Sequence, residues 1–436
     1  MKVLDAEKKI GVEVFFTDFN GVGGTLRTQP EDFSVREISD YPLENKDGRF
    51  LIADITAKHW ETNLLIRELS NWLHISKQRI GFAGTKDKRA TTKRAMSFYN
   101  VKEEKLANVK IKNVDIENIY RSNIPIRIGF LKGNNFELVI RNIEKKVKKE
   151  NVRKSVSFFQ KNGVFPNFYG IQRFGIIRPI THIVGKHIVK GDFKKAAMTY
   201  IANPIKGEDE EIFQLRKKLE ETHDYSESLK NYPKKLNFEK AILNKLVVDS
   251  KDFIGALKEL PRNLITMFVY AYQSYLFNKI LSERIRRKIP LNEAIIGDII
   301  LPIRKGVVDD KGIFVSDKNI EKVNKQISKG KAVVSSVLFG SDSIFSEEEM
   351  GEIEHKIIEK EKILPRDFII PDIPFISSSG SRRPIFTEVK KLDYKLFEDD
   401  LNPGRQALIL KFELQKGCYA TSFIREIMKA DNIKNY

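Results

Sequence analysis

The spacing of apolar residues along the chain predicts both helices and strands. In residues 62–73, three leucines fall at helical spacing, and Thr62 is placed to cap a helix. Residues 264–288 combine a wide apolar face with a basic end, which predicts the clearest helix of the chain, while 377–384 has the composition of a basic loop. Alternating or short apolar runs predict strands at 12–16, 33–38, 80–83, 95–101, 136–140 and 407–414.

The order of these elements favours an α+β fold. Helices and strands do not alternate regularly, which disfavours a doubly wound parallel sheet. A charged run at 145–154 predicts the start of a helix that continues to Gln160. The composition changes after about residue 170, since 205–260 is helical in character and 295–340 resembles short strands with turns.

Length and composition indicate a folded protein of more than one domain. The chain has 436 residues, enough for two or three domains of roughly 150 residues each. Its single cysteine, Cys418, excludes an intramolecular disulfide and a cysteine-rich zinc site, and it indicates a reducing setting. The sequence shows no apolar leader and no run of the ~20 apolar residues that a membrane span needs. We therefore expect a cytoplasmic protein that does not enter a membrane.

The net charge is strongly positive. The chain has 77 Lys and Arg against 59 Asp and Glu, which gives +18 at pH 7. Such a charge is typical of proteins that bind a polyanion, most often nucleic acid. A thermophilic surface rich in Lys and Glu is the alternative interpretation, but such surfaces tend to balance their charges, and this one does not. The charge therefore favours a nucleic-acid partner.

Several common chemistries lack their sequence signatures. The chain has no phosphate-binding Gly-x-x-x-x-Gly-Lys-Ser/Thr loop, no dinucleotide-binding glycine pattern and no Gly-x-Ser-x-Gly motif. None of the six histidines forms a zinc-binding pair; His182 and His187 lie five residues apart, off a common helix face. These absences favour chemistry by a carboxylate, without a cofactor or a metal.

The strongest local pattern is the segment 81–90. It places one carboxylate, Asp87, among Lys86, Lys88 and Arg89, in a turn that follows a predicted strand. Neighbouring cations keep a carboxylate ionised, and an ionised carboxylate in a cationic setting can act as nucleophile or base on a phosphate-rich substrate. The alternative is a solvated turn whose charges cancel.

A second pattern is the segment 167–175, which interleaves aromatic residues with Gln172 and Arg173. Bases stack on aromatic rings and arginine reaches phosphates, so the segment suits nucleic acid. An aromatic-rich loop packed between domains is an equal alternative.

Six segments, in order along the chain, together resemble the motifs of one protein family. They are Pro30–Glu37, Gly84–Ala90, Lys132–Phe136, Asn167–Gly175, Ala271–Asn278 and Lys416–Glu426. The family is the TruD family of tRNA pseudouridine synthases, and Gly84–Ala90 resembles its catalytic motif. The long middle section and the Lys-rich composition are similar to the archaeal branch of that family.

The resemblance implies a fold, a reaction and a partner. It implies a catalytic core of mixed, mainly antiparallel sheet with flanking helices, formed by residues 1–169 and 388–436, and a large α+β insertion (TRUD) domain at 170–387. The two parts would enclose a basic cleft for tRNA. The implied reaction isomerises uridine 13 of tRNA to pseudouridine, without a cofactor or a metal ion. A monomer is the favoured oligomeric state.

The resemblance also implies roles at the reacting centre. Asp87 aligns with the catalytic aspartate, which either attacks the ribose C1′ or acts as the base that starts glycal formation. Arg27 stands where some members carry lysine, so a cation near Asp87 is retained.

Four further residues align with the substrate pocket. Phe33, Phe136 and Tyr419 align with rings of the pocket, and Asn134 aligns with a residue that contacts the base or the backbone. Tyr419 stands where many members carry phenylalanine, so a ring is retained but its hydroxyl needs a partner. Core packing is the alternative role for Phe33 and Phe136.

Two rival functions remain open from the sequence. One is a non-catalytic RNA-binding protein on the same fold, against which the presence of Asp87 argues. The other is a basic protein with a small-molecule substrate, against which the arginine-aromatic segments argue.

Overall fold

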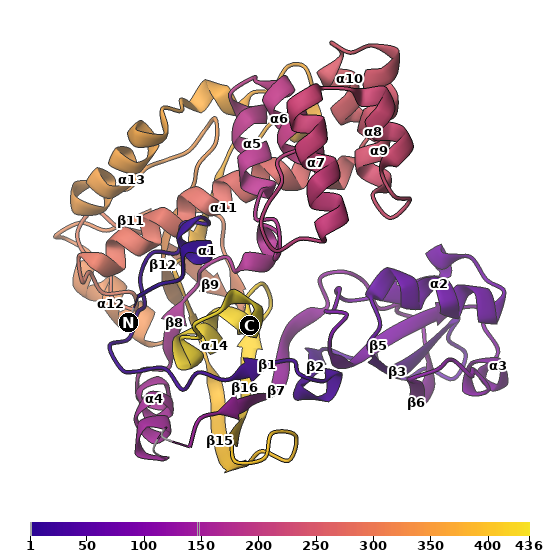
Figure 1. Cartoon of the computed structure of the whole chain (residues 1–436). Helices are drawn as coiled ribbons and strands as arrows, with labels where there is room; N and C mark the ends of the chain where they lie inside the picture. The colour runs from indigo at the N-terminus through magenta and orange to yellow at the C-terminus, as the bar shows by residue number, and fades with distance from the viewer. Residues whose placement is uncertain (1, 146, 148) are drawn as a thin grey trace. The chain divides into compact units, whose positions relative to one another are not determined.

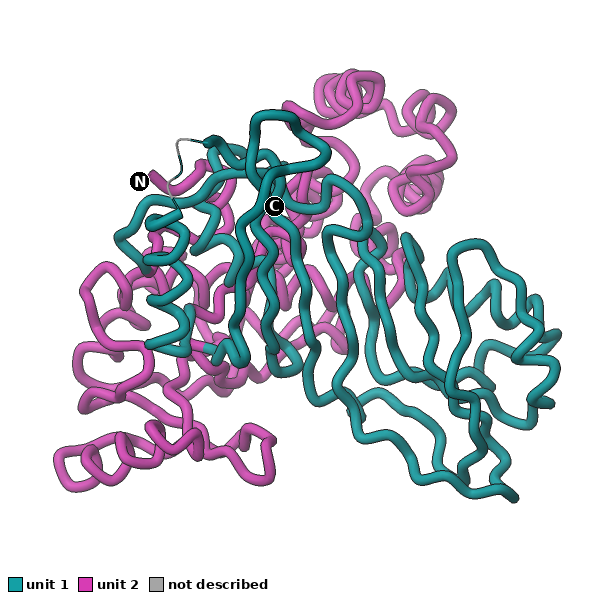
Figure 2. Tube along the Cα trace, turned by 90° about the horizontal axis from the view of Figure 1, so that it is seen from below, with its two compact units in different colours: residues 1, 17–165, 387–436 teal, residues 2–16, 166–386 magenta. Residues whose placement is uncertain are grey.

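The chain forms two compact units in the computed structural model, which describes residues 2–145, 147 and 149–436 (Figure 2). The first unit contains residues 17–165 and 387–436, and the second contains residues 2–16 and 166–386. The short strands β8 (Val164–Pro166) and β14 (Phe386–Glu388) lie where the chain passes from one unit to the other.

The sequence-based division differs from these units mainly at the N-terminus, because it groups the first sixteen residues with the catalytic part. In the structure, Asn278 Nδ2 donates a hydrogen bond to the carbonyl oxygen of Ile10 at 2.9 Å. Ser282 Oγ donates to the carbonyl oxygen of Gly11 at 2.8 Å. These side chains belong to a long helix of the second unit, so the N-terminal segment is part of that unit.

The first unit is built on a nine-stranded sheet among the described residues (Figure 1). Its central path runs β15-β16-β7-β2-β5-β3-β6, with β1 beside β7 and β4 beside β5. Strands β2 and β5 run parallel, whereas the other neighbours on this path run antiparallel. The strands are β1 (Thr25–Leu26), β2 (Phe33–Ser39), β3 (Phe50–Lys58), β4 (Ile80–Phe82), β5 (Thr91–Tyr99), β6 (Val114–Ser122), β7 (Leu131–Ile143), β15 (Lys390–Glu398) and β16 (Gln406–Gln415).

One part of this sheet is covered by α2 (Thr62–Leu73), which begins and ends where the sequence predicts. Leu65 and Leu69 of α2 are fully buried against apolar residues of β3 and β5, such as Leu51 and Met96. Burying a leucine contributes about 1.5–3 kcal/mol relative to leaving it exposed, so this face holds the helix in place.

The cap of α2 differs from the prediction. Glu61, not Thr62, is the capping residue, and its carboxylate accepts a hydrogen bond from the backbone N–H of Leu64 at 2.9 Å. The carboxylate reaches the free amide, which leaves the Thr62 hydroxyl available for other partners.

Another part of the sheet is covered by α14 (Ala420–Met428). The ring of Phe423 lies 4.9 Å from that of Phe412 on β16 and 5.1 Å from that of Phe159 on α4 (Lys149–Asn162). The predicted helix at 145–154 corresponds to α4, although residues 146 and 148 lie outside the described residues. The remaining helices of the unit are α3 (Glu103–Ala107) and the 3-10 turns η1 (Pro30–Asp32), η2 (Lys77–Arg79) and η6 (Ile433–Asn435).

The second unit combines helices with a smaller sheet. Its helices are α1 (Asp5–Lys8), α5 (Thr181–Val189), α6 (Phe193–Ile201), α7 (Glu210–Thr222), α8 (Tyr225–Asn231), α9 (Asn237–Val248), α10 (Phe253–Lys258), α11 (Arg262–Arg286), α12 (Ile320–Ser328) and α13 (Glu348–Glu361), with 3-10 turns η3 (Ile171–Arg173), η4 (Pro365–Phe368) and η5 (Pro374–Ile376). Its strands are β9 (Ile299–Arg304), β10 (Val307–Val308), β11 (Ile313–Phe314), β12 (Ala332–Leu338) and β13 (Ser381–Pro384). Both units together give the expected α+β class, with a mainly antiparallel sheet in the first.

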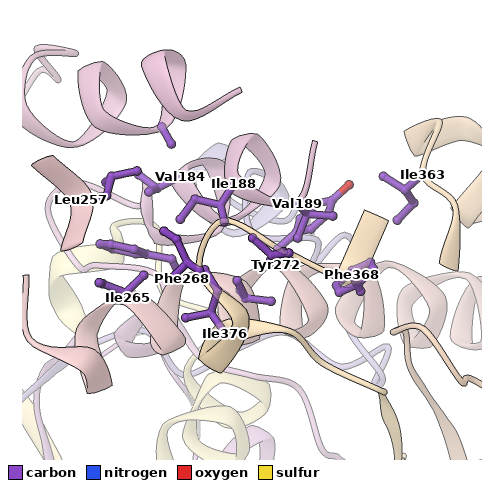
Figure 3. Close-up of a cluster of buried hydrophobic side chains, with 14 of the residues drawn as sticks. Val184, Ile188, Val189, Leu257, Ile265, Phe268, Tyr272, Ile363, Phe368 and Ile376 are labelled. Atoms are coloured by element: carbon purple, nitrogen blue, oxygen red, sulfur yellow. The ribbon is translucent and has the colours of Figure 1, made fainter. Parts of the chain in front are cut away.

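The core of the second unit forms around α11, which confirms the helix expected at 264–288. Phe268 and Tyr272 of α11 lie among buried aliphatic residues of α5, including Val184 and Ile188 (Figure 3). Tyr272 is 0% exposed, and its hydroxyl donates to a carboxylate oxygen of Glu361 at 3.3 Å. The helix therefore acts as the central support of this unit.

Besides the cap of α2, residues 320–328 differ from the prediction, because they form helix α12 in a segment expected to hold short strands and turns. Two further predictions of local structure are wrong. Residues 12–16 form no strand, because this segment runs beside α11, where Ser282 Oγ accepts a hydrogen bond from the Glu13 N–H at 3.0 Å. The predicted loop at 377–384 ends in strand β13, since Ser381–Pro384 finds partners along β12. In the described part of the chain, no helix is long and apolar enough to cross a membrane.

Candidate active site

Asp87 lies in the loop between β4 and β5 of the first unit, with 57% of its side chain exposed. Its Oδ2 accepts a hydrogen bond from Arg27 Nη2 at 2.7 Å. A charge-assisted hydrogen bond of this length fixes the direction of the carboxylate while leaving it open to solvent. The loop therefore presents one oriented carboxylate at the surface.

Arg27 is held from three sides. Its guanidinium carbon lies 4.0 Å from the centre of the Phe33 ring, and its side chain is 10% exposed. Its carbonyl oxygen accepts a hydrogen bond from Arg89 Nη2 at 3.0 Å. Burial lowers the pKa of the Arg27 guanidinium and the Asp87 carboxylate opposes that shift, so the arginine stays charged.

The backbone at Arg27 is in an unusual conformation. Its φ is +61°, in the left-handed region that non-glycine residues other than Asn and Asp rarely adopt. This conformation is maintained by the contacts of its side chain and carbonyl group with Asp87, Phe33 and Arg89. The strain is located at the residue that orients the exposed carboxylate.

The loop is anchored by the residue before Asp87. Lys86 Nζ lies 3.0 Å from Glu37 Oε2, and the two side chains are 5% and 1% exposed. Burial lowers the pKa of the Lys86 ammonium, and the attraction of Glu37 opposes that shift. An ion pair this deeply buried is costly to break, because removing one partner leaves an uncompensated charge.

The backbone of the same residue is held by Thr62. The Lys86 N–H donates to Thr62 Oγ1 at 2.9 Å, and Arg94 Nη1 donates to the same oxygen at 2.9 Å. Arg94 is 0% exposed, and burial lowers its pKa to about 10. Because Glu61 caps α2, the Thr62 hydroxyl can join the Asp87 loop to the sheet.

Strand register places most of the predicted pocket residues on one face of the sheet. Phe136 lies directly opposite Val35 of β2 and Phe412 of β16, and Asn134 lies opposite Glu37. Directly opposed residues project to the same face. The polar residues Glu37 and Asn134 therefore occupy the same covered face of the sheet as the aromatic cluster.

The aromatic rings form a connected series. The Phe33 and Phe136 rings lie edge to face, with centroids 6.2 Å apart, and Phe136 stacks on Phe412 at 5.2 Å. Phe33 is 2% exposed and Phe136 is 9% exposed, so Phe33 supports Arg27 from below and Phe136 reaches the surface only slightly. The structure thus joins Asp87, Arg27, Phe33 and Phe136 by successive contacts.

Asn134 and Tyr419 are placed less directly. The Asn134 Oδ1 atom is buried and has no hydrogen-bond partner among the described residues. Tyr419 is partly buried and immediately precedes α14. The loop before it starts beside Asn134, because Leu414 pairs with Asn134 and the Lys416 N–H donates to the Lys132 carbonyl oxygen at 2.9 Å.

Three residues of this arrangement were not identified from the sequence: Glu37, Thr62 and Arg94. A signal was present for two of them. Glu37 follows Phe33 and Val35 at alternate positions of β2, and Arg94 precedes the buried Met96 at the same spacing on β5. A charged residue at an inward position of a strand indicates a buried ion pair.

No group of three or more His, Cys, Asp or Glu residues that could hold a metal ion occurs within the described residues. The second candidate segment, 167–175, belongs to the second unit and contains the turn η3.

Sequence and structure comparisons with known proteins all identify the same family. The family model for tRNA pseudouridine synthase D (TruD) matches residues 9–427. A protein named probable tRNA pseudouridine synthase D from Methanococcoides burtonii is 41% identical, with 99% of each chain covered. Its namesake from Methanosarcina barkeri is 39% identical, with 100% of both chains covered. A crystal structure described as that of TruD from Methanosarcina mazei superposes with a TM-score of 0.90 at 39% identity, and it covers 100% of both chains.

Proposed function

Because the chain belongs to the tRNA pseudouridine synthase D (TruD) family, whose members are isomerases, we propose that it converts uridine 13 of tRNA to pseudouridine with Asp87 as the catalytic carboxylate. The observation that carries this proposal is the pairing of an exposed carboxylate with a buried arginine at 2.7 Å. A solvated turn with cancelling charges would not need a strained, buried partner.

The reaction moves the uracil from one bond to another. The bond between C1′ and N1 breaks, and the detached uracil turns within the pocket. C5 then forms a new bond to C1′ and loses its proton, while N1 gains one, so that the product is an isomer of the substrate. Asp87 either adds to C1′ as the uracil leaves and is released when C5 bonds to C1′, or removes the C2′ proton to form a glycal and returns a proton to C2′ when C5 bonds to C1′. Both roles need the charged carboxylate, and Arg27 holds that carboxylate toward the solvent side where a ribose can approach.

The uridine must leave its stack to reach Asp87, and we propose that Phe136, Asn134 and Tyr419 receive it. The unpartnered Asn134 Oδ1 is an acceptor that suits the N3–H of uracil. Phe33 acts in this proposal through Arg27, since its ring is almost fully buried beneath the guanidinium.

The partner in this proposal is tRNA. A net charge of +18 supplies the attraction for its phosphates. A tRNA substrate places the protein in the cytoplasm, and we propose that it acts as a monomer.

Mapping pseudouridine in an unmodified tRNA transcript tests the position. We expect one new pseudouridine, at position 13, after incubation with the protein. A matched transcript with cytidine at position 13 should gain none. Modification at a different uridine in both transcripts would contradict the assigned position.

A further inference from the structure

The second unit contains a cavity of about 320 Å³ that the proposed catalysis does not use. It is lined by Tyr169, Arg173, Tyr270, Gln273, Leu338 and residues 377–381. These residues come from four segments far apart in the sequence: the aromatic-rich segment, α11, β12 and the serine-rich segment at the start of β13. Its volume is at the lower end of the range for small-molecule sites, about 300–1,000 Å³.

The charge of this cavity comes from one arginine, without a carboxylate beside it in the described part of the chain. Arg173 is the charged residue of its lining, and no acidic residue is present among the described residues that line it. Two other cavities of the same unit mix both charges: one contains Lys190, Lys194 and Lys251 with Asp192 and Asp252, and the other contains Arg382 with Asp310 and Asp342. The cavity with Arg173 therefore suits an anion, because no carboxylate among the described residues of its lining competes for the arginine.

Arg173 is free to bind such an anion. Its buried Nε has no hydrogen-bond partner within the described part of the chain. Its guanidinium carbon lies 5.9 Å from the centre of the Tyr169 ring. A planar guanidinium with unused donors matches the geometry of a phosphate group, which it can bind through two parallel hydrogen bonds.

The part of the cavity wall formed by residues 377–381 is rich in hydroxyl groups. Residues 377–381 contribute four serines, and the side chains of Ser377, Ser379 and Ser381 belong to exposed residues. Gln273 Nε2 fixes this segment by donating to Ser378 Oγ at 2.9 Å and to the Phe339 carbonyl oxygen at 2.7 Å. Serine hydroxyls donate hydrogen bonds to phosphate oxygens, so the segment supplies neutral donors beside the arginine.

Two tyrosines complete the cavity. The backbone of Tyr169 is held by Asn278, which accepts from its N–H at 2.9 Å and donates to its carbonyl oxygen at 3.0 Å. Tyr270 is 44% exposed, an unusual exposure for a large ring on a central helix. An exposed ring next to an anion site can stack on a base.

We propose that this cavity is a subsite for a phosphate group of a nucleotide, bound by Arg173 and the serine hydroxyls, with Tyr270 beside it for the base. This proposal rests on the proposed function, because it takes tRNA as the source of the phosphate group. A free nucleotide carries the same chemistry, and the test separates the two sources.

The test uses the full-length protein and two probes, an unmodified tRNA transcript and uridine 5′-monophosphate. Arg173→Gln should weaken tRNA binding severalfold at moderate salt. It should also reduce the slope of log affinity against log salt by about 0.7–0.9, which corresponds to one phosphate contact. Arg304→Gln is the matched control, because Arg304 is 79% exposed on β9 of the same unit, pairs with Asp309 and does not line the cavity.

A second pair of variants covers the case in which Arg173→Gln is unstable. Ser379→Asp places a negative charge at an exposed position of the cavity, and Ser328→Asp places the same charge at an exposed position of α12. We expect Ser379→Asp to weaken binding and Ser328→Asp to leave it nearly unchanged.

The outcomes separate clearly. A loss of tRNA affinity in the cavity variants and not in their controls supports the subsite with tRNA as its source. A loss confined to uridine monophosphate supports the subsite with a free nucleotide as its source. Equal behaviour of cavity and control variants with both probes overturns the proposal. These readouts measure binding and need no catalytic turnover. A protein that binds tRNA through Arg173 but forms no pseudouridine would therefore contradict the proposed function and leave the subsite supported.

Discussion

Lys86 and Glu37 form an ion pair at 3.0 Å beneath the loop that carries Asp87, and both side chains are almost completely buried. The pair joins the loop to strand β2, whose residue Phe33 also supports Arg27. The exposed carboxylate and its arginine are thus held by the same strand. This connection explains how a loop of polar residues can hold an exposed carboxylate in one direction.

We expect Glu37→Gln to destabilise the first unit by about 3–5 kcal/mol, because Lys86 would remain charged and buried without its partner. The double variant Glu37→Gln/Lys86→Met should recover part of that loss. Denaturant unfolding followed by tryptophan fluorescence measures this, since both tryptophans of the chain, Trp60 and Trp72, lie in the first unit.

A matched control for that experiment is Glu137→Gln. Glu137 pairs with Lys411 at 3.1 Å, but the two side chains are 50% and 55% exposed. Exposed pairs contribute at most about 1 kcal/mol, so this variant should change the unfolding free energy little. Equal losses for Glu37→Gln and Glu137→Gln would mean that the buried pair does not anchor the loop.

Arg27→Lys should slow catalysis more than it weakens tRNA binding. Lysine keeps the charge, but it lacks the planar group that covers Phe33 while donating to Asp87. A hydrogen bond to a charged group contributes about 1.5–3 kcal/mol, so we expect the single-turnover rate at saturating tRNA to fall roughly 10- to 100-fold. Arg36→Lys, at an exposed position of β2, is the control. A normal rate in Arg27→Lys would show that a cation beside Asp87 suffices and that the planar guanidinium is not needed.

Tyr419 tests the base pocket without disturbing the core. Tyr419→Phe keeps the ring and should retain the rate within a few-fold, whereas Tyr419→Ala should slow it roughly 5- to 150-fold, because stacking contributes about 1–3 kcal/mol per base. Thermal midpoints accompany both rates. If Tyr419→Ala lowers the midpoint strongly but leaves the rate of the folded fraction normal, the ring belongs to the fold and not to the pocket.

Phe136 needs a gentler change, because it is 9% exposed and stacks on Phe412. A core Phe→Ala substitution costs about 3–5 kcal/mol of folding free energy, which would obscure any effect on the substrate. Phe136→Leu keeps most of the volume and removes the ring. A slower single-turnover rate with a nearly unchanged midpoint is the expected result.

His182 makes the stability of the second unit depend on pH. Burial lowers its pKa from 6.5 to about 4, and Lys186 contributes to the same shift while Glu361 opposes it. Between pH 6.5 and pH 4 the unfolded chain binds a proton at His182, whereas the folded chain does not. The free energy of unfolding therefore falls as the pH falls from 6.5 to 4, by at most about 3 kcal/mol.

The variant His182→Phe should flatten this part of the pH profile. The ring stacks on Tyr275 at 5.0 Å, and phenylalanine can occupy that place without titrating. Thermal midpoints measured by circular dichroism between pH 7 and pH 4.5 provide the comparison, with His355→Phe as an exposed control. A profile of His182→Phe that parallels the unmodified protein would show that His182 does not carry this dependence.

The sequence predicted the elements whose signals are local. The leucine spacing of 62–73 located α2, and the apolar face of 264–288 located α11 within two residues at each end. The strand predicted at 12–16 does not form, because a strand needs a partner strand and this segment packs beside helix α11 instead. Strand β13 was missed for the converse reason, because its partner β12 lies some forty residues away. The helix α12 was also missed, although Val323 and Ile327 give it a buried side.

At the candidate site, too, the sequence predicts some contacts and not others. The contact between Asp87 and Arg27 follows from the motif resemblance, but the anchoring of the loop does not. Thr62 has the composition of a helix cap, and only the three-dimensional placement of Glu61 frees it to bind the Lys86 backbone. The partners of Lys86 come from a different strand and a different helix, and a single sequence does not specify such long-range contacts.

The most direct test of the account is the single-turnover formation of pseudouridine by Asp87→Asn. Asparagine has nearly the same shape, so it can accept from Arg27, but it can neither take a proton nor form an adduct with the ribose. We predict no detectable pseudouridine, tRNA affinity within a few-fold of the unmodified protein, and full activity in Asp115→Asn, a change at an exposed position of β6. Pseudouridine formation by Asp87→Asn at a rate near that of the unmodified protein would contradict the assignment of Asp87 as the catalytic carboxylate.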